Sequence, residues 1–262
     1  MRHSGKLPEV DWQQPWLAPY AGLGRQLAAS VADGVSVAAA LTRHAGPALS
    51  FEFVAAPVAK PGLPYETLIF TTRSIPTRDN LHDLFNGLCW SVFPQAKQRL
   101  NQLQADEIAA TGVRTARGPL RDAITLFDEN AALLQAPDML WQALAARQWQ
   151  RLFGELRPLW REARLTLFGH ALLEKLGRPY KSITAHVWRA DPALQSLSEL
   201  DAWLAQDLTP DKLARKPFAT LPVLGVPGWC GANEDPAFYR DAEVFRGAAQ
   251  SRKGHVPSDT KA

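Results

Sequence analysis

The sequence predicts a mostly helical α+β fold with a few short strands and hairpins. Several segments repeat apolar residues every three or four positions, as helices that face a core do. Only short runs are rich in β-branched and aromatic residues between Pro or Gly, as strands are. The two patterns do not alternate as in a repeating βαβ sheet. We expect a single globular domain over residues 1–246 and a disordered polar tail over residues 247–262.

The helices follow from apolar periodicity and from residues suited to helix ends. Asn80 can cap one helix at its N-terminus, and Pro94 and Pro158 suit the first turn of two others. The segments expected to be helical are 20–30, 35–44, 81–92, 94–108, 139–156, 158–176 and 197–208.

The strands are short and lie between turn residues. Three prolines and a glycine make 56–64 a loop, and 128–131 has the composition of a turn between two strands of a hairpin. The segments expected to be strands are 51–55, 65–72, 123–127, 132–134 and 183–188. Residues 209–246 form a Pro/Gly-rich, irregular segment with aromatic anchors, expected to wrap the domain.

Composition limits the class of protein. Among 262 residues, 46% are hydrophobic and 21% are charged, which is typical of a folded globular chain. Two cysteines provide no disulfide or metal framework, and we expect both to be free thiols. The first residues lack the apolar stretch of a signal peptide, and no apolar run approaches the roughly 20 residues that span a bilayer. The sequence therefore predicts a cytoplasmic protein with no membrane partner.

The net charge of +3 permits an anionic partner without requiring one. The basic residues come closest together at Arg147, Arg151, Arg157, Arg161 and Arg164. A solvated helical face explains this group, and a nucleic-acid contact remains an alternative.

His170 and Glu174 are the first candidate site residues. On the expected helix 158–176 they lie four residues apart, on the side that carries the apolar residues. A buried carboxylate needs a partner, because its uncompensated burial costs several kcal/mol, as a rough estimate. A divalent metal ion, a proton transfer to substrate, or a purely structural hydrogen bond would each provide one.

The second candidate group begins the helix 81–92. His82 and Asp83 lie in its first turn, and Asn86 lies one turn beyond His82 on the same side. An adjacent His-Asp pair occurs in metal phosphohydrolases of the HD type. Asp83 also has a structural explanation, because an acid three residues after the cap Asn80 stabilises the first turn.

The third group is acidic and flanks the expected strand 123–127. Asp122 and Asp128 would lie at opposite ends of one strand face, too far apart to share an ion. Asp128 and Glu129 suit a magnesium or manganese ion, and they suit an ordinary turn equally well. The sequence contains no serine-hydrolase elbow, phosphate-binding Gly-rich loop, His-Glu-x-x-His or Cys-x-x-Cys motif.

Three stretches taken together, 80–97, 121–129 and 168–175 followed by Pro179-Tyr-Lys181, resemble a proteobacterial family of unknown function. It is the domain of unknown function number three thousand and twenty-five. The resemblance covers about residues 16–246 and implies a cytoplasmic bacterial origin. It implies no catalytic roles. The family pattern would include His82, Asp83, Asn86, Lys97, Asp122, Asp128, Glu129, His170, Glu174 and Lys181.

Our leading functional hypothesis is a hydrolase that depends on a divalent metal ion and acts on a phosphate ester. The expected catalytic residues are His82, Asp83, His170 and Glu174. The expected metal ligands are His82, His170, Glu174 and Asp128. The expected contacts to an anionic small-molecule substrate are Arg78, Asn86, Lys97 and Lys181.

Two alternatives remain open. One is a non-catalytic protein that binds anions or nucleic acid, and the other is a scaffold whose buried polar residues are structural. The enzyme requires that His82 and His170 meet in space.

Overall fold

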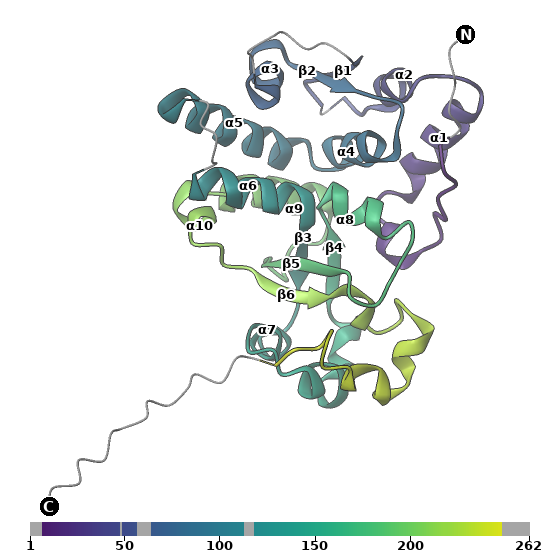
Figure 1. The fold of residues 1–262 in the computed structure, drawn as a ribbon, viewed down its shortest axis with the longest axis vertical. Helices are drawn as coiled ribbons and strands as arrows, with labels where there is room; N and C mark the ends of the chain where they lie inside the picture. Colours follow the sequence, from purple (N-terminus) through teal and green to yellow (C-terminus); the bar gives the residue numbers. More distant parts are fainter. Residues whose placement is uncertain (1–6, 48, 57–63, 113–117, 248–262) are drawn as a thin grey trace, which may run out of the picture.

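The structure of the protein is a computed structural model, and it describes residues 7–47, 49–56, 64–112 and 118–247. The fold is a mostly helical α+β arrangement with two small sheets, as the sequence predicts (Figure 1). Buried apolar side chains from Trp16 to Phe245 form one contiguous cluster. Within the described residues, no helix combines the length and the apolar character needed to cross a bilayer.

The larger sheet has the strand order β4-β3-β5-β6. Its strands are β3 (Ala131–Gln135), β4 (Arg164–Leu167), β5 (Thr184–Arg189) and β6 (Ala219–Pro222). β3 runs parallel to β5 and antiparallel to β4. All five residues of β3 are buried, which is why its first four residues are all apolar rather than alternating with polar ones.

A group of helices lies on the side of this sheet that faces the smaller sheet (Figure 1). It contains α4 (Leu81–Val92), α5 (Pro94–Thr111), α6 (Pro119–Asn130), α8 (His170–Lys175), α9 (Leu197–Asp207) and α10 (Pro210–Ala214). α4 contacts α8, and α5 contacts α6 and α9. On the opposite side lie α7 (Asp138–Ala145) and the C-terminal segment.

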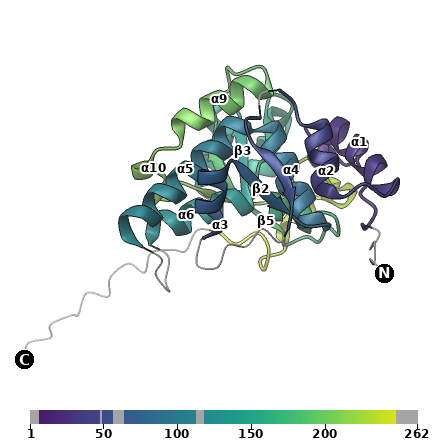
Figure 2. The ribbon, with the colours of Figure 1, turned by 90° about the horizontal axis from the view of Figure 1, so that it is seen from above.

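The smaller sheet pairs β1 (Glu52–Ala55) with β2 (Ser74–Thr77) in parallel, and α3 (Tyr65–Thr72) lies in the connection between them. α1 (Ala21–Ala32) and α2 (Val37–His44) lie at one end of the molecule, and α5, α6 and α10 lie at the other (Figure 2). α4 and α5 therefore lie between the two sheets, where they can present side chains to both.

Local chemistry fixes the ends of the helices that matter for the site. The Asn80 side chain accepts a hydrogen bond from the Asp83 amide at 2.7 Å, as predicted for an N-cap, and Pro94 begins α5. Gly169, just before α8, allows a close approach, because a Cβ there would lie 2.4 Å from the Glu129 carbonyl oxygen. The absence of a side chain at Gly169 therefore lets the start of α8 lie against the end of α6.

The prediction of strands at 65–72 and 123–127 was wrong, because these residues form α3 and α6. The predicted turn 128–131 was also wrong, because it is the end of α6 and the first residue of β3. Asp122 and Asp128 therefore lie on one helix rather than on a strand face. Short runs of β-branched and aromatic residues suit a buried helix turn as well as a strand. β3 includes the predicted strand 132–134, but it pairs with β4 and β5 rather than closing a hairpin.

The two long helices predicted over 139–156 and 158–176 were also wrong. α7 ends at Ala145, and Arg147 has a positive φ of 51° that interrupts the helix. A π-helical turn, a 3-10 turn and β4 follow before α8 begins. The arginines of this region therefore share no continuous helical face. Arg157 pairs with Glu234, and Arg164 donates to the Leu194 carbonyl.

The remaining elements agree with the sequence. The predicted helices 20–30, 35–44, 81–92, 94–108 and 197–208 correspond to α1, α2, α4, α5 and α9, and the predicted strands 51–55 and 183–188 to β1 and β5. Most of the predicted loop 56–64, and the predicted tail from residue 248 onward, lie outside the described residues. The segment 209–246 is more regular than expected, since it contains α10, β6 and three 3-10 turns.

Candidate functional site

A pocket of about 530 Å³ lies among α3, α4, α5 and α6, and the first residue of α8 closes one side of it. Each helix contributes side chains at the spacing of one face, three or four residues apart. From α4, α5 and α6 these are His82, Asp83, Asn86 and Trp90, then Lys97, Leu100, Asn101 and Gln104, then Ile124, Thr125, Asp128 and Glu129. Tyr65 and Glu66 of α3 complete the opposite wall.

His82 is hydrogen-bonded to Glu174 of α8, with 2.8 Å between Nδ1 and Oε2. Their side chains are 39% and 41% exposed, so the pair lies at the edge of the core. The prediction that Glu174 is a buried carboxylate was therefore wrong, whereas His170 is buried as expected. A carboxylate oxygen accepts, so this contact favours the tautomer with the proton on Nδ1. Nε2 of His82 is then an acceptor. His82 lines the pocket and Glu174 does not, so the carboxylate supports the imidazole from behind.

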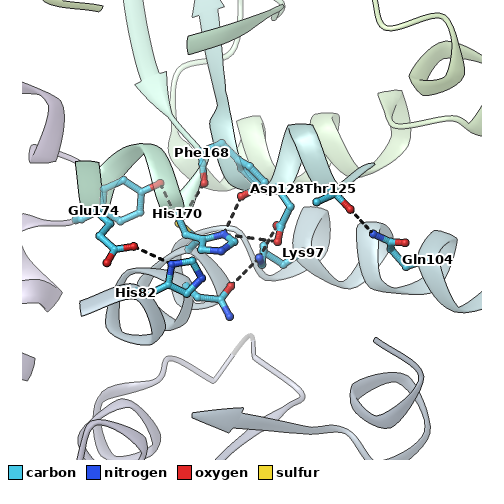
Figure 3. Close-up of polar contacts among 11 residues, drawn as sticks. His82, Lys97, Gln104, Thr125, Asp128, Phe168, His170 and Glu174 are labelled. Carbon is cyan, nitrogen blue, oxygen red and sulfur yellow. Dashed lines mark hydrogen bonds and ion pairs between the residues drawn. The ribbon is translucent and has the colours of Figure 1, made fainter. Parts of the chain in front are cut away.

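His170 lies beside His82, with 4.7 Å between the ring centroids in an edge-to-face arrangement (Figure 3). Its Nδ1 lies 2.8 Å from the Asp128 carbonyl oxygen, which can only accept, so the proton is on Nδ1. Burial lowers the pKa of His170 to about 4, aided by the charges of Lys97 and His82 and opposed by Asp128. The His170 imidazole is therefore neutral at neutral pH.

Lys97 is a buried cation held between two oxygen acceptors. Its side chain is 3% exposed, and Nζ lies 2.5 Å from Asp128 Oδ1 and 2.9 Å from Asn86 Oδ1 (Figure 3). Burial opposes ionisation of Asp128, but Lys97 and His170 outweigh that effect and hold the pKa of this carboxyl below its usual value. The buried charges are thus paired, as their desolvation requires.

Asp83 and Arg78 form a second ion pair at the rim. The Asp83 carboxylate accepts from Nε and Nη2 of Arg78 at 3.0 and 2.9 Å, and from the Arg78 backbone amide at 2.6 Å. The Arg78 side chain is exposed and the Asp83 side chain is buried. Asp83 therefore stabilises the first turn of α4 and also positions Arg78.

The structure brings together most of the residues nominated from sequence. His82 contacts His170, as the enzyme hypothesis requires. Both lie within the same cluster of contacts as the other nominated groups, namely Arg78, Asp83, Asn86, Lys97, Asp128 and Glu174. Lys181 does not join them. It forms an ion pair with Asp241 at 2.9 Å and lies 4.4 Å from the Phe238 ring centroid, outside the pocket lining.

The hydrogen bonds at Nδ1 of His82 and of His170 leave both Nε2 atoms available, either as proton acceptors or as metal ligands. Among the described residues, no group of three or more His, Cys, Asp or Glu side chains is arranged to hold a metal ion. Two of the nominated ligands, His82 and Glu174, are hydrogen-bonded to each other. The Nδ1 atom of His170 is engaged by the Asp128 carbonyl oxygen. Metal binding by His82, His170, Glu174 and Asp128 stays a prediction.

Sequence reasoning missed the polar wall formed by α5. Asn101 and Gln104 are buried, and with Lys97 and Leu100 they follow the three-and-four spacing of one helical face. The spacing is visible in the sequence. Polar residues at positions that share a helical face with Leu100 were the signal that could have identified this wall.

The chain belongs to the protein family of unknown function DUF3025, whose family model matches residues 51–249. This match confirms the resemblance found in the sequence. It begins later than the residues we expected it to cover. Searches matched no curated protein and no solved structure.

Proposed function

We propose that this member of DUF3025 is an enzyme that binds a small polar molecule in the pocket among α3, α4, α5 and α6. His82 is its general base. One observation carries the proposal, the hydrogen bond between His82 Nδ1 and Glu174 Oε2 at the edge of the pocket.

A carboxylate on Nδ1 prepares a histidine for proton transfer in two ways. It fixes the tautomer in which Nε2 can accept a proton, and it stabilises the imidazolium that then forms. Glu174 makes this contact with His82, while the pocket lies beside the same imidazole.

His170 supports this role because it is neutral. A second imidazolium 4.7 Å away would repel the charge that His82 gains, whereas burial keeps His170 uncharged at neutral pH. Its Nδ1 proton is engaged by the Asp128 carbonyl, so its Nε2 is a further acceptor that could orient a water molecule.

Lys97 supplies a positive charge that is already fixed before substrate binds. Its ammonium group is held by Asp128 and Asn86, so stabilising negative charge that develops on a substrate would require little reorganisation.

Hydrolysis is the reaction class that suits these groups best. His82 Nε2 would accept a proton from water while the water oxygen attacks the substrate. The protonated His82 would then return that proton to the leaving group. Among the described residues that line the pocket, Thr125 and Tyr65 carry the hydroxyl groups. The Thr125 hydroxyl donates to the Arg121 carbonyl at 2.9 Å, and the Tyr65 hydroxyl donates to the Pro76 carbonyl at 3.4 Å. Water is therefore the nucleophile we propose.

Hydrolysis of chromogenic amides, esters and phosphate esters by the full-length protein tests the proposal. We expect turnover of at least one class, and we expect His82→Gln to reduce it by about 100-fold or more, the usual contribution of a general base. His44→Gln is the matched control, because His44 bonds to Ser30 outside the pocket. Equal activity in His82→Gln and the parent would contradict the role of His82.

A metal-dependent phosphate esterase remains a second candidate, because His82, His170 and Asp128 line one pocket. Metal analysis of the purified protein decides between the two. A stoichiometric divalent ion that is lost in His170→Ala would favour the metal enzyme. Full activity in the presence of a chelator would favour the metal-free reaction.

A further inference from the structure

Asn101 of α5 is a buried amide in the pocket wall with one atom left unpartnered. The residue is 7% exposed, and its Nδ2 donates to the Glu66 carbonyl oxygen at 2.8 Å. That bond fixes the orientation of the amide, so the remaining atom is the acceptor Oδ1. Oδ1 has no hydrogen-bond donor among the described residues. Buried acceptors are normally paired, so this atom indicates a ligand that brings an N–H or O–H group. Oδ1 has almost no accessible surface, so the ligand reaches it only when neighbouring side chains shift.

The charges of the pocket point to the same kind of ligand. Its lining contains four acids and two bases, and the two bases are already paired, Arg78 with Asp83 and Lys97 with Asp128. These pairs leave the carboxylates of Glu66 and Glu129, for which no ion pair is found in the described part of the chain.

Charges just behind the lining do not reverse this balance. Arg121 donates to Gln104 at 3.3 Å and adds one positive charge, and Glu174 behind His82 adds one negative charge. An anionic ligand would therefore enter a pocket with excess negative charge, and a neutral or cationic one would not be repelled.

The apolar part of the wall limits the shape of the ligand. Trp90, Leu100 and Ile124 line the pocket together with the polar groups and can pack against a flat or aliphatic body. A ligand with an apolar body and a polar end bearing hydrogens matches both parts.

We propose that the pocket recognises a small molecule whose polar end is a neutral or cationic N–H donor, such as an amide, amidine or amine. The uncompensated carboxylates bind that end, and the Asn101 acceptor joins them when its neighbours shift on binding. A phosphate ester or another anion is disfavoured. This assignment of substrate class rests on the proposed function, in that it takes this pocket to be the substrate site.

Three probes of the same shape test the assignment, namely benzamidine, benzamide and benzoate. They differ mainly in charge and in the number of N–H donors. We expect calorimetry with the full-length protein to give the affinity order benzamidine, then benzamide, then benzoate. The first and last should differ by about tenfold or more, as expected for hydrogen bonds to charged groups.

Two variants test whether Asn101 and Glu129 cause the affinity order of the three probes. Asn101→Leu should weaken benzamidine and benzamide by about tenfold, because it removes the acceptor. Glu129→Gln should weaken benzamidine several-fold and leave benzamide unchanged, because it removes only charge. Glu155→Gln, exposed and outside this pocket, is the matched control. If Asn101→Leu does not fold, Glu129→Gln still decides, since it keeps the size of the side chain.

Tightest binding by benzoate would overturn the assignment. So would the absence of binding by all three probes at millimolar concentration, or unchanged affinities in both variants. The calorimetric binding measurement involves no turnover, so its result is independent of the activity test of His82. The predicted binding order with an active His82→Gln variant would contradict the proposed general base and leave the ligand class standing. A different binding order together with an inactive His82→Gln variant would contradict the ligand class alone.

Discussion

Two regions of the molecule use buried polar residues in different ways. In the C-terminal segment, Asn233 is fully buried, and its Nδ2 donates to the carbonyls of Leu224 and Val226 at 2.8 and 2.7 Å. Arg157 joins it through hydrogen bonds to Asn233, Tyr239 and Glu234. In the pocket, by contrast, Asn101 has an unpartnered acceptor and His82 is half-exposed. In the C-terminal segment the buried polar groups are hydrogen-bonded to one another and to the backbone. In the pocket, hydrogen-bond acceptors are left for another molecule.

The difference shows why burial alone does not identify a functional site. Arg157 and Asn233 are partnered by nearby chain and need no ligand. The pocket gathers charged groups from helices far apart in sequence and leaves hydrogen-bonding capacity unused. Substitutions in the C-terminal segment should therefore change stability, and substitutions in the pocket should change binding and chemistry.

The largest expected effect is on stability, in the C-terminal segment. Asn233→Leu removes both donors to buried carbonyls, each worth about 1–3 kcal/mol when left unpaired. We expect the free energy of unfolding to fall by about 4 kcal/mol in urea denaturation. The activity of the folded fraction should not change. A loss below about 1 kcal/mol would show that this region is less closed than the contacts indicate.

A smaller effect concerns pH and comes from His170. Its pKa falls from the ordinary value of 6.5 in the unfolded chain to about 4 in the folded protein, mainly because the imidazole is buried. The unfolded state therefore binds the proton first as pH falls. The stability contributed by neutral His170 is present above the unfolded pKa and is lost as pH falls from 6.5 towards 4.

We expect this group to remove about 2 kcal/mol of stability between neutral pH and about pH 5. His170→Asn keeps a donor for the Asp128 carbonyl but does not titrate, so its stability should fall less over this range. Parallel stability curves for the parent and the variant would show that His170 is not held neutral by the fold.

The smallest effect on stability is expected at Glu174. The Glu174→Gln variant alters a half-exposed pair, so stability should change by less than about 1 kcal/mol. Activity should fall about tenfold, because the amide stabilises the His82 imidazolium less than a carboxylate does. Steady-state kinetics over a range of pH check this. An unchanged rate and pH profile would show that the His82–Glu174 contact has no catalytic role.

The fold was predictable where local chemistry decides it. The N-cap at Asn80, the proline that begins α5 and the apolar spacing of α4 all depend on residues close in sequence. α3 and α6 were mistaken for strands, because a short run of apolar and β-branched residues is compatible with either structure. The interruption at Arg147 depends on a backbone angle that its side chain does not signal.

The site was predictable in its residues and not in its arrangement. His170 and Glu174 were correctly placed one turn apart in a helix, although that helix is the short α8 rather than a long one. The contact between His82 and Glu174 spans 92 positions, and sequence periodicity carries no information on such distances. Lys181 was expected to belong to the family pattern together with the others, yet it pairs with Asp241 away from the pocket. Asn101 was missed because the feature that distinguishes it, an acceptor without a donor among the described residues, depends on the folded structure.

The central claim is that Glu174 holds His82 in the tautomer that can accept a proton from a substrate or water. Side-chain nitrogen-15 spectra of the full-length protein at neutral pH test it most directly, with His82→Gln used to assign the signals. We predict that His82 carries its proton on Nδ1 and leaves Nε2 unprotonated, and that Glu174→Gln shifts this signal. A proton on Nε2, or a signal unaffected by Glu174→Gln, would contradict the claim.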